Sequence, residues 1–568
     1  MCGAGQYTRP MFVRVKTTPN SPRKSVQLVE GVRVDGKVRQ RIVRHVGVAS
    51  DEVELARLRE LGEFLKLQES HARQPGLFPP DQVAGELIRA GRRAAESAGP
   101  ALLGVDLGAL REEQRVVTGI HEAYGCVYRE LGLDRLLSAR HRASARALFH
   151  TVMARIANPR SKRESVRRLG RDFGVALPLE KVYRMMDRLD GRVVGKLRSR
   201  VAAAADALLP EPLDVLFFDC TTLYFESVSE DAGEDGLRRF GYSKDGKPHR
   251  VQVVLALMVT RGGLPVGYEV FPGAQYEGKT FLPVMAEMRE RHPGLEAVCV
   301  ADAGMFGEAN LAGLESEGHR YIVGARLQSL PKALKERIVE TGRYRGAAAM
   351  EAGGRVAVFR HRGRRIVVAH SPKRAAKDKK DRQRGVKRLL DKLNKSGKPK
   401  SLLPKGMGRF LRMRGEGSWE VDPDKIAEAA RWDGLRGVVT NVRGLSVAEL
   451  WERYHGLWRV ERGFRVSKHD LKVRPIFHWT PKRIRAHLAI AFMAFACVQH
   501  LAYRVELQKK RALSPEAIRD ALLHRQCSIL KHAGKPERYA VPSPATVEAE
   551  MIYDALGLRF TDAPYALN

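Results

Sequence analysis

Apolar and polar residues alternate over most of residues 11–49, in runs such as FVRVKT, KSVQLVEGVRV and RQRIVRHVGV. A period of two is typical of β-strands that bury one face. Asp35-Gly36 lies between the last two runs, and this dipeptide favours a tight hairpin turn. The pattern therefore predicts a small basic β-meander. The helical spacing of apolar residues over 51–72 predicts a helix directly after it.

Uninterrupted apolar runs replace this alternation in the middle of the chain. LDVLFFD, from Leu213, and AVCVAD, from Ala297, each end in an aspartate. Two further apolar runs, 251–260 and 265–271, are joined by Gly262-Gly263, and the segment 279–292 has helical spacing. Continuous apolar runs of this length are typical of strands buried on both faces. The order β, hairpin, α, β, α, β predicts an α/β core.

Changes in this pattern divide the chain into seven segments. We predict an N-terminal basic β-meander and helix at 1–72, a linker at 73–100, a helical DNA-binding domain at 101–209, the first part of the core at 210–326, a β-rich and basic insertion at 327–437, the second part of the core with a glutamate-bearing helix at 438–505, and a C-terminal helical region for dimerisation at 506–568.

The charge narrows the choice of partner. The 568 residues include 100 Lys+Arg against 65 Asp+Glu, a formal net charge of +35. Such an excess indicates a polyanion, and double-stranded DNA is the partner that we expect. Between Lys373 and Arg409 there are 15 basic residues and 3 aspartates, which predicts an ordered basic arm along a phosphate backbone. Arg160, Lys162 and Arg163 crowd a predicted helix start and fit either a DNA contact or a solvated face.

Two other features of the sequence indicate where in the cell the protein acts. The six cysteines are scattered without a C-x-x-C pair, which favours reduced thiols and argues against a zinc ribbon. The most apolar run, 488–503, is too short for a membrane span and contains Gln499 and His500. We therefore expect a buried helix there, no membrane partner, and a cytoplasmic, nucleoid-associated protein.

Three acidic residues are the candidates for chemistry. Asp219 and Asp302 end two predicted buried strands, where a charge is costly unless it is hydrated, paired or bound to metal. A later helix, which a Ser446/Glu449 capping box begins, carries Glu461. Tyr454, Glu461 and Lys468 are seven residues apart and are predicted to share one helix face. Convergent carboxylates suit hard cations such as Mg²⁺ or Mn²⁺.

These residues carry a resemblance to a known family. DCTT (219–222), DAGMF (302–306) and the Y-x6-E-x6-K pattern from Tyr454 to Lys468 resemble the DDE transposases of the IS4-like group of bacterial insertion sequences. The segments MARIANPRSKRE, GYSKDGKP and FRVSKHDLKVRPIFHW are similar to the branch of the IS1634 elements. An arginine of the IS4-type signature is replaced here by Leu457, with Arg459 close by.

The resemblance implies an α/β, RNase H-like catalytic core of the retroviral integrase superfamily, with the β-rich insertion before its glutamate helix. It makes Asp219, Asp302 and Glu461 the catalytic residues and metal ligands, for two Mg²⁺ ions per active site, with Mn²⁺ able to substitute. It implies cleavage at terminal inverted repeats and joining of 3′-OH ends to target DNA by two-metal phosphoryl transfer, in a homodimeric synaptic complex. The expected DNA-binding residues are Tyr454, Lys468, Arg459, Arg465, Arg160, Lys162 and Arg163.

Two other functions remain open from the sequence. A structure-selective nuclease with the same fold would cut DNA without joining it. A DNA-binding protein whose catalysis has lapsed would bind DNA without cutting it. In an assay with end DNA and a target plasmid, joined products favour a transposase over a nuclease, and binding without cleavage in Mg²⁺ or Mn²⁺ identifies the lapsed protein.

Overall fold

The structure, a computed structural model, describes most of the chain. The described residues are 12–18, 21–34, 37–49, 51–52, 54–56, 58–59, 61–63, 66, 83–96, 105–210, 213–233, 236–291, 296–346, 354–396, 407–414 and 418–567. The predicted turn at 35–36 and much of the predicted 51–72 helix and 73–100 linker lie outside them. The N-terminal meander is present as an antiparallel sheet of β1 (Phe12–Thr18), β2 (Ser21–Val34) and β3 (Lys37–Ala49).

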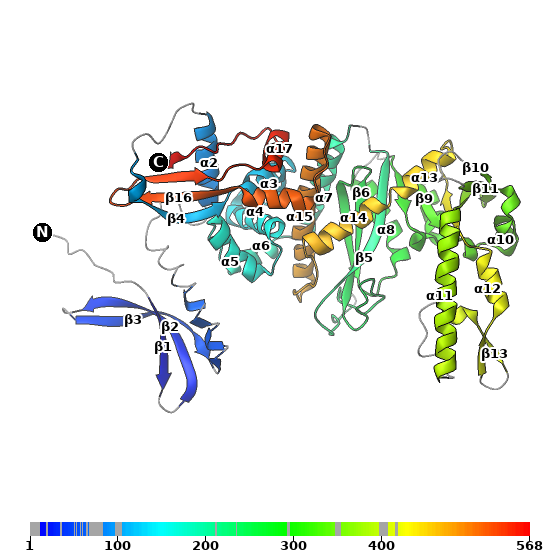
Figure 1. Cartoon of the computed structure of the whole chain (residues 1–568), viewed down its shortest axis with the longest axis horizontal. Coiled ribbons are helices and arrows are strands. Elements are labelled where there is room, and N and C mark those ends of the chain that lie inside the picture. The colour runs from blue at the N-terminus through cyan, green and yellow to red at the C-terminus, as the bar shows by residue number, and fades with distance from the viewer. Residues whose placement is uncertain are drawn as a thin grey trace.

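A nine-stranded mixed sheet forms the centre of the molecule (Figure 1). Its spatial order is β10-β11-β12-β15-β9-β8-β5-β6-β7, and the parallel neighbours are β5 with β8 and β8 with β9. The strands are β5 (Val215–Tyr224), β6 (Gln252–Thr260), β7 (Pro265–Pro272), β8 (Val298–Ala301), β9 (Arg320–Ala325), β10 (Arg345–Gly346), β11 (Arg355–His361), β12 (Arg364–His370) and β15 (Leu435–Thr440). The predicted α/β core and its β, hairpin, α, β, α, β order are confirmed.

Helices cover both faces of this sheet. Alternate β5 residues, among them Phe218, pack with α8 (Phe281–Arg291), α9 (Glu308–Ser316) and α10 (Lys332–Val339). The intervening β5 residues, among them Phe217, pack with α13 (Val447–His455), α14 (Trp458–Arg465) and α15 (Pro481–Lys509). Because successive strand residues point to opposite faces, Asp219 shares the face of Phe217 with α13 and α14.

The segment 506–568 is not the helical region that the sequence predicted. It contains α16 (Pro515–His524) and α17 (Val547–Ala555) but also β16 (Gln526–His532), β17 (Arg538–Pro542) and β18 (Tyr565–Leu567). These strands form one sheet with β4 (Leu110–Val117) in the order β18-β17-β16-β4, in which β16 pairs with β4. The pairing joins residues more than 400 positions apart, as Arg115 and Ser528 are, so no local pattern specifies it.

The strand β4 also corrects the prediction for 101–209, which is otherwise helical. Its helices are α3 (Gly119–Glu130), α4 (Arg142–Ala157), α5 (Lys162–Phe173), α6 (Leu179–Met186) and α7 (Gly191–Leu208). Part of the predicted linker is a packed helix, α2 (Val83–Glu96), whose Leu87 is buried and whose carbonyl accepts a hydrogen bond from Tyr565 (3.2 Å). Residues 83–117 and 526–567, which are far apart in the sequence, therefore pack together in one structural unit.

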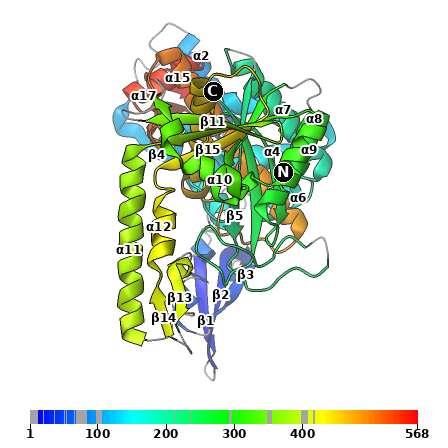
Figure 2. The same cartoon turned by 90° about the vertical axis from the view of Figure 1, so that its right-hand side faces the viewer.

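The insertion differs from the prediction in one respect, because its strands β10, β11 and β12 extend the central sheet. The predicted basic helix is present as α11 (Pro372–Ser396). It lies beside α12 (Pro423–Ala430) and the hairpin of β13 (Leu411–Arg414) and β14 (Ser418–Val421) (Figure 2). Buried Leu389, Phe410 and Leu411 join these elements in a small apolar core. A bidentate ion pair between Arg382 and Asp433 holds α11 at its sheet end.

The predicted buried helix at 488–503 is the middle of α15. By length and composition α15 could cross a membrane, but 78% of its most apolar window is buried inside the protein. It packs between the central sheet and the helical unit of α3, α4 and α16. Burial within the fold explains its apolar composition.

Candidate active site

Asp219 and Asp302 lie at neighbouring positions of β5 and β8. Asp302 directly follows β8, as predicted, but the prediction that a strand ends at Asp219 is wrong, because β5 continues to pair with β6 as far as Tyr224. Asp219 follows Phe218, which pairs with Ala301 in the parallel register of β5 and β8, and Asp302 follows Ala301. Alternation along β8 places Asp302 on the α13–α14 face, as it does Asp219 on β5. Burial raises the pKa of Asp219 to about 6; nearby Lys244 opposes this shift, and the charges of Glu277 and Asp302 add to it. The register of β5 and β8 therefore places the two aspartates next to each other on one face of the sheet.

The glutamate-bearing helix begins as predicted, because Ser446 and Glu449 form a reciprocal capping box. The sequence predicted one regular helix as far as Lys468, and this prediction is wrong. A turn at Gly456 and Leu457 separates α13 from α14, where Arg459 N–H bonds the carbonyl three residues earlier (3.0 Å). A π-helical turn, η9 (Val466–Asp470), then carries Lys468. Each irregularity rotates the residues that follow it, so the even heptad spacing does not define one straight face.

The turn at Gly456 supplies a first testable prediction. A Cβ there would overlap the ring of Phe217, so Gly456→Ala should force α13 and α14 away from β5. Overpacking of this kind costs about 1–3 kcal/mol. We expect a lower midpoint in urea unfolding and weaker DNA cleavage, because Glu461 moves with α14.

Gly195 in α7 provides the matched control, since a Cβ there meets nothing within 4 Å. Gly195→Ala should leave stability unchanged or raise it by up to about 1 kcal/mol. Equal midpoints for the two variants would contradict the contact with Phe217.

Tyr454 contacts Asp302 and is close enough to Glu461 to sense its charge. Burial raises the pKa of Tyr454 to about 12, and the charge of Asp302, a hydrogen bond to that carboxylate and the charge of Glu461 add to the shift. The hydroxyl lies against Gly324, and a Cβ at Gly324 would overlap it. Tyr454 therefore orients Asp302 at the sheet edge, with exposed Glu461 on the same side.

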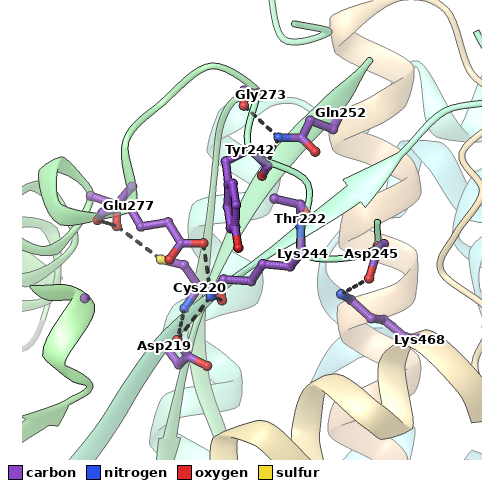
Figure 3. Close-up of polar contacts among 12 residues, drawn as sticks. Asp219, Cys220, Thr222, Tyr242, Lys244, Asp245, Gln252, Gly273, Glu277 and Lys468 are labelled. Carbon is purple, nitrogen blue, oxygen red and sulfur yellow. Dashed lines mark hydrogen bonds and ion pairs between the residues drawn. The ribbon is translucent and has the colours of Figure 1, made fainter. Parts of the chain in front are cut away.

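Lys244 and Glu277 belong to this site but were not predicted from the sequence. Lys244 Nζ lies 3.0 Å from Glu277 Oε1 and 3.8 Å from Asp219 Oδ1, and donates to the carbonyl of Cys220 at 2.6 Å (Figure 3). Burial lowers the pKa of Lys244, but Asp219 and Glu277 more than offset this and raise it. A lysine four residues before a proline carries no local signal of its partner, so only the fold reveals this contact.

Lys468 is also engaged within the protein. Its Nζ donates to Asp245 Oδ1 at 3.0 Å, and Arg474 Nη1 lies 2.5 Å from the other oxygen of the same carboxylate (Figure 3). The Lys468 and Asp245 side chains are only 10% and 8% exposed. Burial lowers the pKa of Lys468 although Asp245 stabilises its charge. Arg474 is a second basic residue of the site that the sequence reasoning missed.

The other predicted DNA-binding residues do not gather at this site. Arg459 lies over the rings of Phe217 and Trp458, whereas Arg465 is exposed. Arg160 and Arg163 are exposed at the start of α5 in the helical unit. Lys162 between them is 6% exposed, and burial, with Arg155 nearby, holds its pKa well below the ordinary value. Its prediction as a surface DNA contact is therefore wrong in this structure, because the first turn of α5 points that side chain inward.

Two aspartates on adjacent parallel strands of an α/β sheet, under a helix that carries a glutamate, are an arrangement typical of enzymes that cut and join DNA. Residues 210–497, just over half of the chain, match the family model of the transposase DDE domain. Residues 12–74 match the N-terminal domain of IS1634 family transposases. The chain therefore belongs to the DDE transposase family and is a DNA transposase of the IS1634 type, an enzyme of metal-dependent DNA cleavage and strand transfer.

Two further comparisons add little. A search of curated proteins found no match. The cryo-EM structure of a piggyBac transposase synaptic complex with hairpin DNA is similar over 79% of this chain and 78% of that chain, with 10% identity and a TM-score of 0.37. A TM-score this low does not establish a shared fold.

The family implies a divalent metal, and the donor chemistry of the site fits one. Among the described residues, no three His, Cys, Asp or Glu side chains lie close enough together to hold an ion as they stand. The donors at Asp219, Asp302 and Glu277 are all hard oxygens, which Mg²⁺ and Mn²⁺ prefer. The Lys244 ammonium already lies against two of these carboxylates, so this position accommodates positive charge.

Proposed function

We propose that this transposase has an RNase H-like core in which Asp219, Asp302 and Glu461 are the catalytic acids. The observation that supports this assignment is the adjacent placement of Asp219 and Asp302 on parallel strands, under the helix pair that carries Glu461. Tyr454 supports this assignment further, since the charges of both Asp302 and Glu461 raise the pKa of its hydroxyl.

The proposed chemistry divides between metal and side chains. Two bound Mg²⁺ ions, or Mn²⁺ in their place, would neutralise charge on the attacking and leaving oxygens of a phosphodiester. Asp219, Asp302 and Glu461 would hold these ions, and Tyr454 would orient the Asp302 carboxylate. Lys468 would bind a phosphate of the element's end as a point charge. The buried setting of Asp219 strengthens its interaction with any cation.

The proposed substrates are the terminal inverted repeats of the element and a target DNA, held in a homodimeric synaptic complex. A formal charge of +35 supports DNA as the partner, and we place the enzyme in the cytoplasm at the nucleoid. Arg160, Arg163 and Arg465 are exposed and can reach phosphates. Arg459 is half-buried and is assigned to positioning α14 against β5.

The test is a joining assay with labelled end DNA, a supercoiled target plasmid and Mg²⁺ or Mn²⁺. We expect a nick at the element's end, followed by labelled plasmid as the 3′-OH attacks the target. Cleavage without labelled plasmid would identify a nuclease. Binding without any cleavage in either metal would identify a catalytically lapsed DNA-binding protein.

The exposed face of α11 yields a second prediction, about affinity. Basic residues recur there every three or four positions, which aligns them along about 21 Å of one helix face: Lys373, Lys377, Lys380, Arg384 and Lys387. If this face follows a DNA backbone, alanine at Lys377, Lys380 and Lys387 removes about three phosphate contacts. The slope of log affinity against log salt should then become shallower by about 2.7.

The loss should be the same for any duplex sequence, because phosphate contacts carry no sequence information. Gln383→Ala, at an exposed uncharged position of the same helix, is the control and should leave the slope unchanged. An unchanged slope in the triple variant would exclude α11 from the DNA interface.

A further inference from the structure

A tight turn in residues 241–248, the segment GYSKDGKP, places two opposite charges at its tip. We name this segment the strap. Gly246 N–H bonds the carbonyl of Ser243, so Lys244 and Asp245 occupy the two central turn positions, and Gly246 has a positive φ of 68°. Their side chains diverge, Lys244 toward Asp219 and Glu277 and Asp245 toward Lys468 (Figure 3).

The base of the strap is fixed to the sheet. Gln252 on β6 is 1% exposed, and its amide donates to the carbonyls of Tyr242 (3.1 Å) and Gly273 (3.0 Å). Gly241 packs so closely against the Gly273 carbonyl that no side chain fits there. At the tip, Lys244 donates from its N–H to the Thr222 hydroxyl (3.0 Å) and from its ammonium to the Cys220 carbonyl (2.6 Å). The anchored base sets the direction of the strap, and side-chain contacts hold its tip.

Each tip residue occupies side chains that the proposed reaction needs for binding metal or DNA. Lys244 places an ammonium against Asp219 and Glu277, where the proposed site needs a divalent cation. Asp245 places a carboxylate between Lys468 and Arg474, where the proposed site needs a DNA phosphate. Carboxylate and phosphate oxygens compete for the same donors, and an ammonium and a metal ion compete for the same carboxylates.

We propose that the strap is an autoinhibitory element in which Lys244 substitutes for the metal ion and Asp245 substitutes for a phosphate of the element's end. The proposal also assigns Arg474 as a second phosphate-binding residue beside Lys468, and Glu277 as a fourth carboxylate of the acidic site. It rests on the proposed function of Asp219 and Lys468. DNA and metal must displace the two tip residues, so binding of either loosens the strap for the other.

The first arm of the test measures DNA binding by the full chain without divalent ions. Asp245→Asn removes the competing charge with nearly the same shape, and should bind a labelled element-end duplex about tenfold more tightly than the wild type. Glu226→Gln is the control, since it also removes one acidic charge near the strap but pairs with Arg250 at the surface. Binding by Asp245→Asn that is no tighter than by Glu226→Gln overturns the proposal.

The second arm measures binding of Mn²⁺ alone by electron paramagnetic resonance, with no DNA. Lys244→Met should bind Mn²⁺ about tenfold more tightly than the wild type. Lys247→Met is the control, because it removes the same charge from the strap while its ammonium lies over Tyr224. Lys244→Gln, which can still donate to the Cys220 carbonyl, replaces Lys244→Met if that variant melts early. Unchanged or weaker Mn²⁺ binding overturns the proposal.

Asp219→Asn separates the failure of this proposal from that of the proposed function. If the wild type binds Mn²⁺ and Asp219→Asn does not, the metal site stands, and the Lys244 variants decide the strap alone. If Asp219→Asn binds Mn²⁺ as the wild type does, with and without end DNA, the proposed function fails as well.

Discussion

Glu461→Gln should abolish DNA cleavage while DNA binding persists. The substitution keeps the size of an exposed side chain on α14 and removes its charge, so folding should change by less than about 0.5 kcal/mol. Losing one preorganised group that stabilises transition-state charge costs about 10²–10³ in rate, and a residue that would hold the catalytic metal should lie at the upper end. We expect a cleavage rate about 10³-fold below the wild type, measured in single turnover with Mg²⁺, and end-DNA affinity within about threefold.

Glu452→Gln is the matched control for this prediction. Glu452 is exposed on α13, two turns before Glu461, and pairs with Arg261 at the surface. This variant should cut and join DNA as the wild type does. Cleavage by Glu461→Gln within tenfold of the wild type would reject Glu461 as the third acid. Glu277 would then be the candidate, because it already lies beside Asp219 through Lys244, and Glu277→Gln would have to show the loss instead.

The central strands were predictable because their signal is local. The apolar runs before Asp219 and Asp302 are continuous, as burial on both faces requires, but only β8 ends at its aspartate, whereas β5 continues to Tyr224. The Ser446/Glu449 capping box is likewise a contact within four residues, and it formed as predicted. Where the residues of one segment determine its structure, the sequence pattern was sufficient to predict that structure.

The errors arise where distant segments decide the outcome. The strand 526–532 pairs with 110–117 on one side and with 538–542 on the other, and a short alternating run alone does not identify the distant partner. The break in the glutamate helix depends on Gly456 packing against Phe217 of β5. Lys244 and Asp245 are adjacent in sequence yet contact Glu277 and Lys468, which are far from them along the chain. Such contacts follow from tertiary packing, which overrides local propensity.

Arg364→Met should strongly destabilise the core, because it removes a buried charge that is paired with two carboxylates. Arg364 begins β12 and is 6% exposed. Its guanidinium donates two bonds to Glu315 (2.8 and 2.9 Å) and one to Glu308 (2.8 Å), both on α9, and Tyr321 donates to Glu315 at 2.6 Å. This network joins the insertion to the catalytic core. Removing the buried cation leaves Glu315 without its bidentate partner, while half-exposed Glu308 keeps its pair with Arg362. We therefore expect a cost at the lower end of the range for a broken buried pair, about 3 kcal/mol, and a lower urea midpoint.

The pH dependence and a neighbouring residue distinguish this account from a simple packing loss. Hydrogen bonds from Arg364 hold the pKa values of Glu315 and Glu308 below their ordinary value of 4.5. Carboxyls with a depressed pKa contribute stability that is present above 4.5 and is lost as pH falls through the folded-state pKa. The difference in the free energy of unfolding between wild type and Arg364→Met should therefore be largest near neutral pH and shrink in acid.

Arg362→Met is the control variant. The Arg362 side chain is 59% exposed and also pairs with Glu308, so its loss should cost less than about 1 kcal/mol. Arg364→Lys should recover only part of the loss, because an ammonium cannot reproduce the bidentate bond to Glu315.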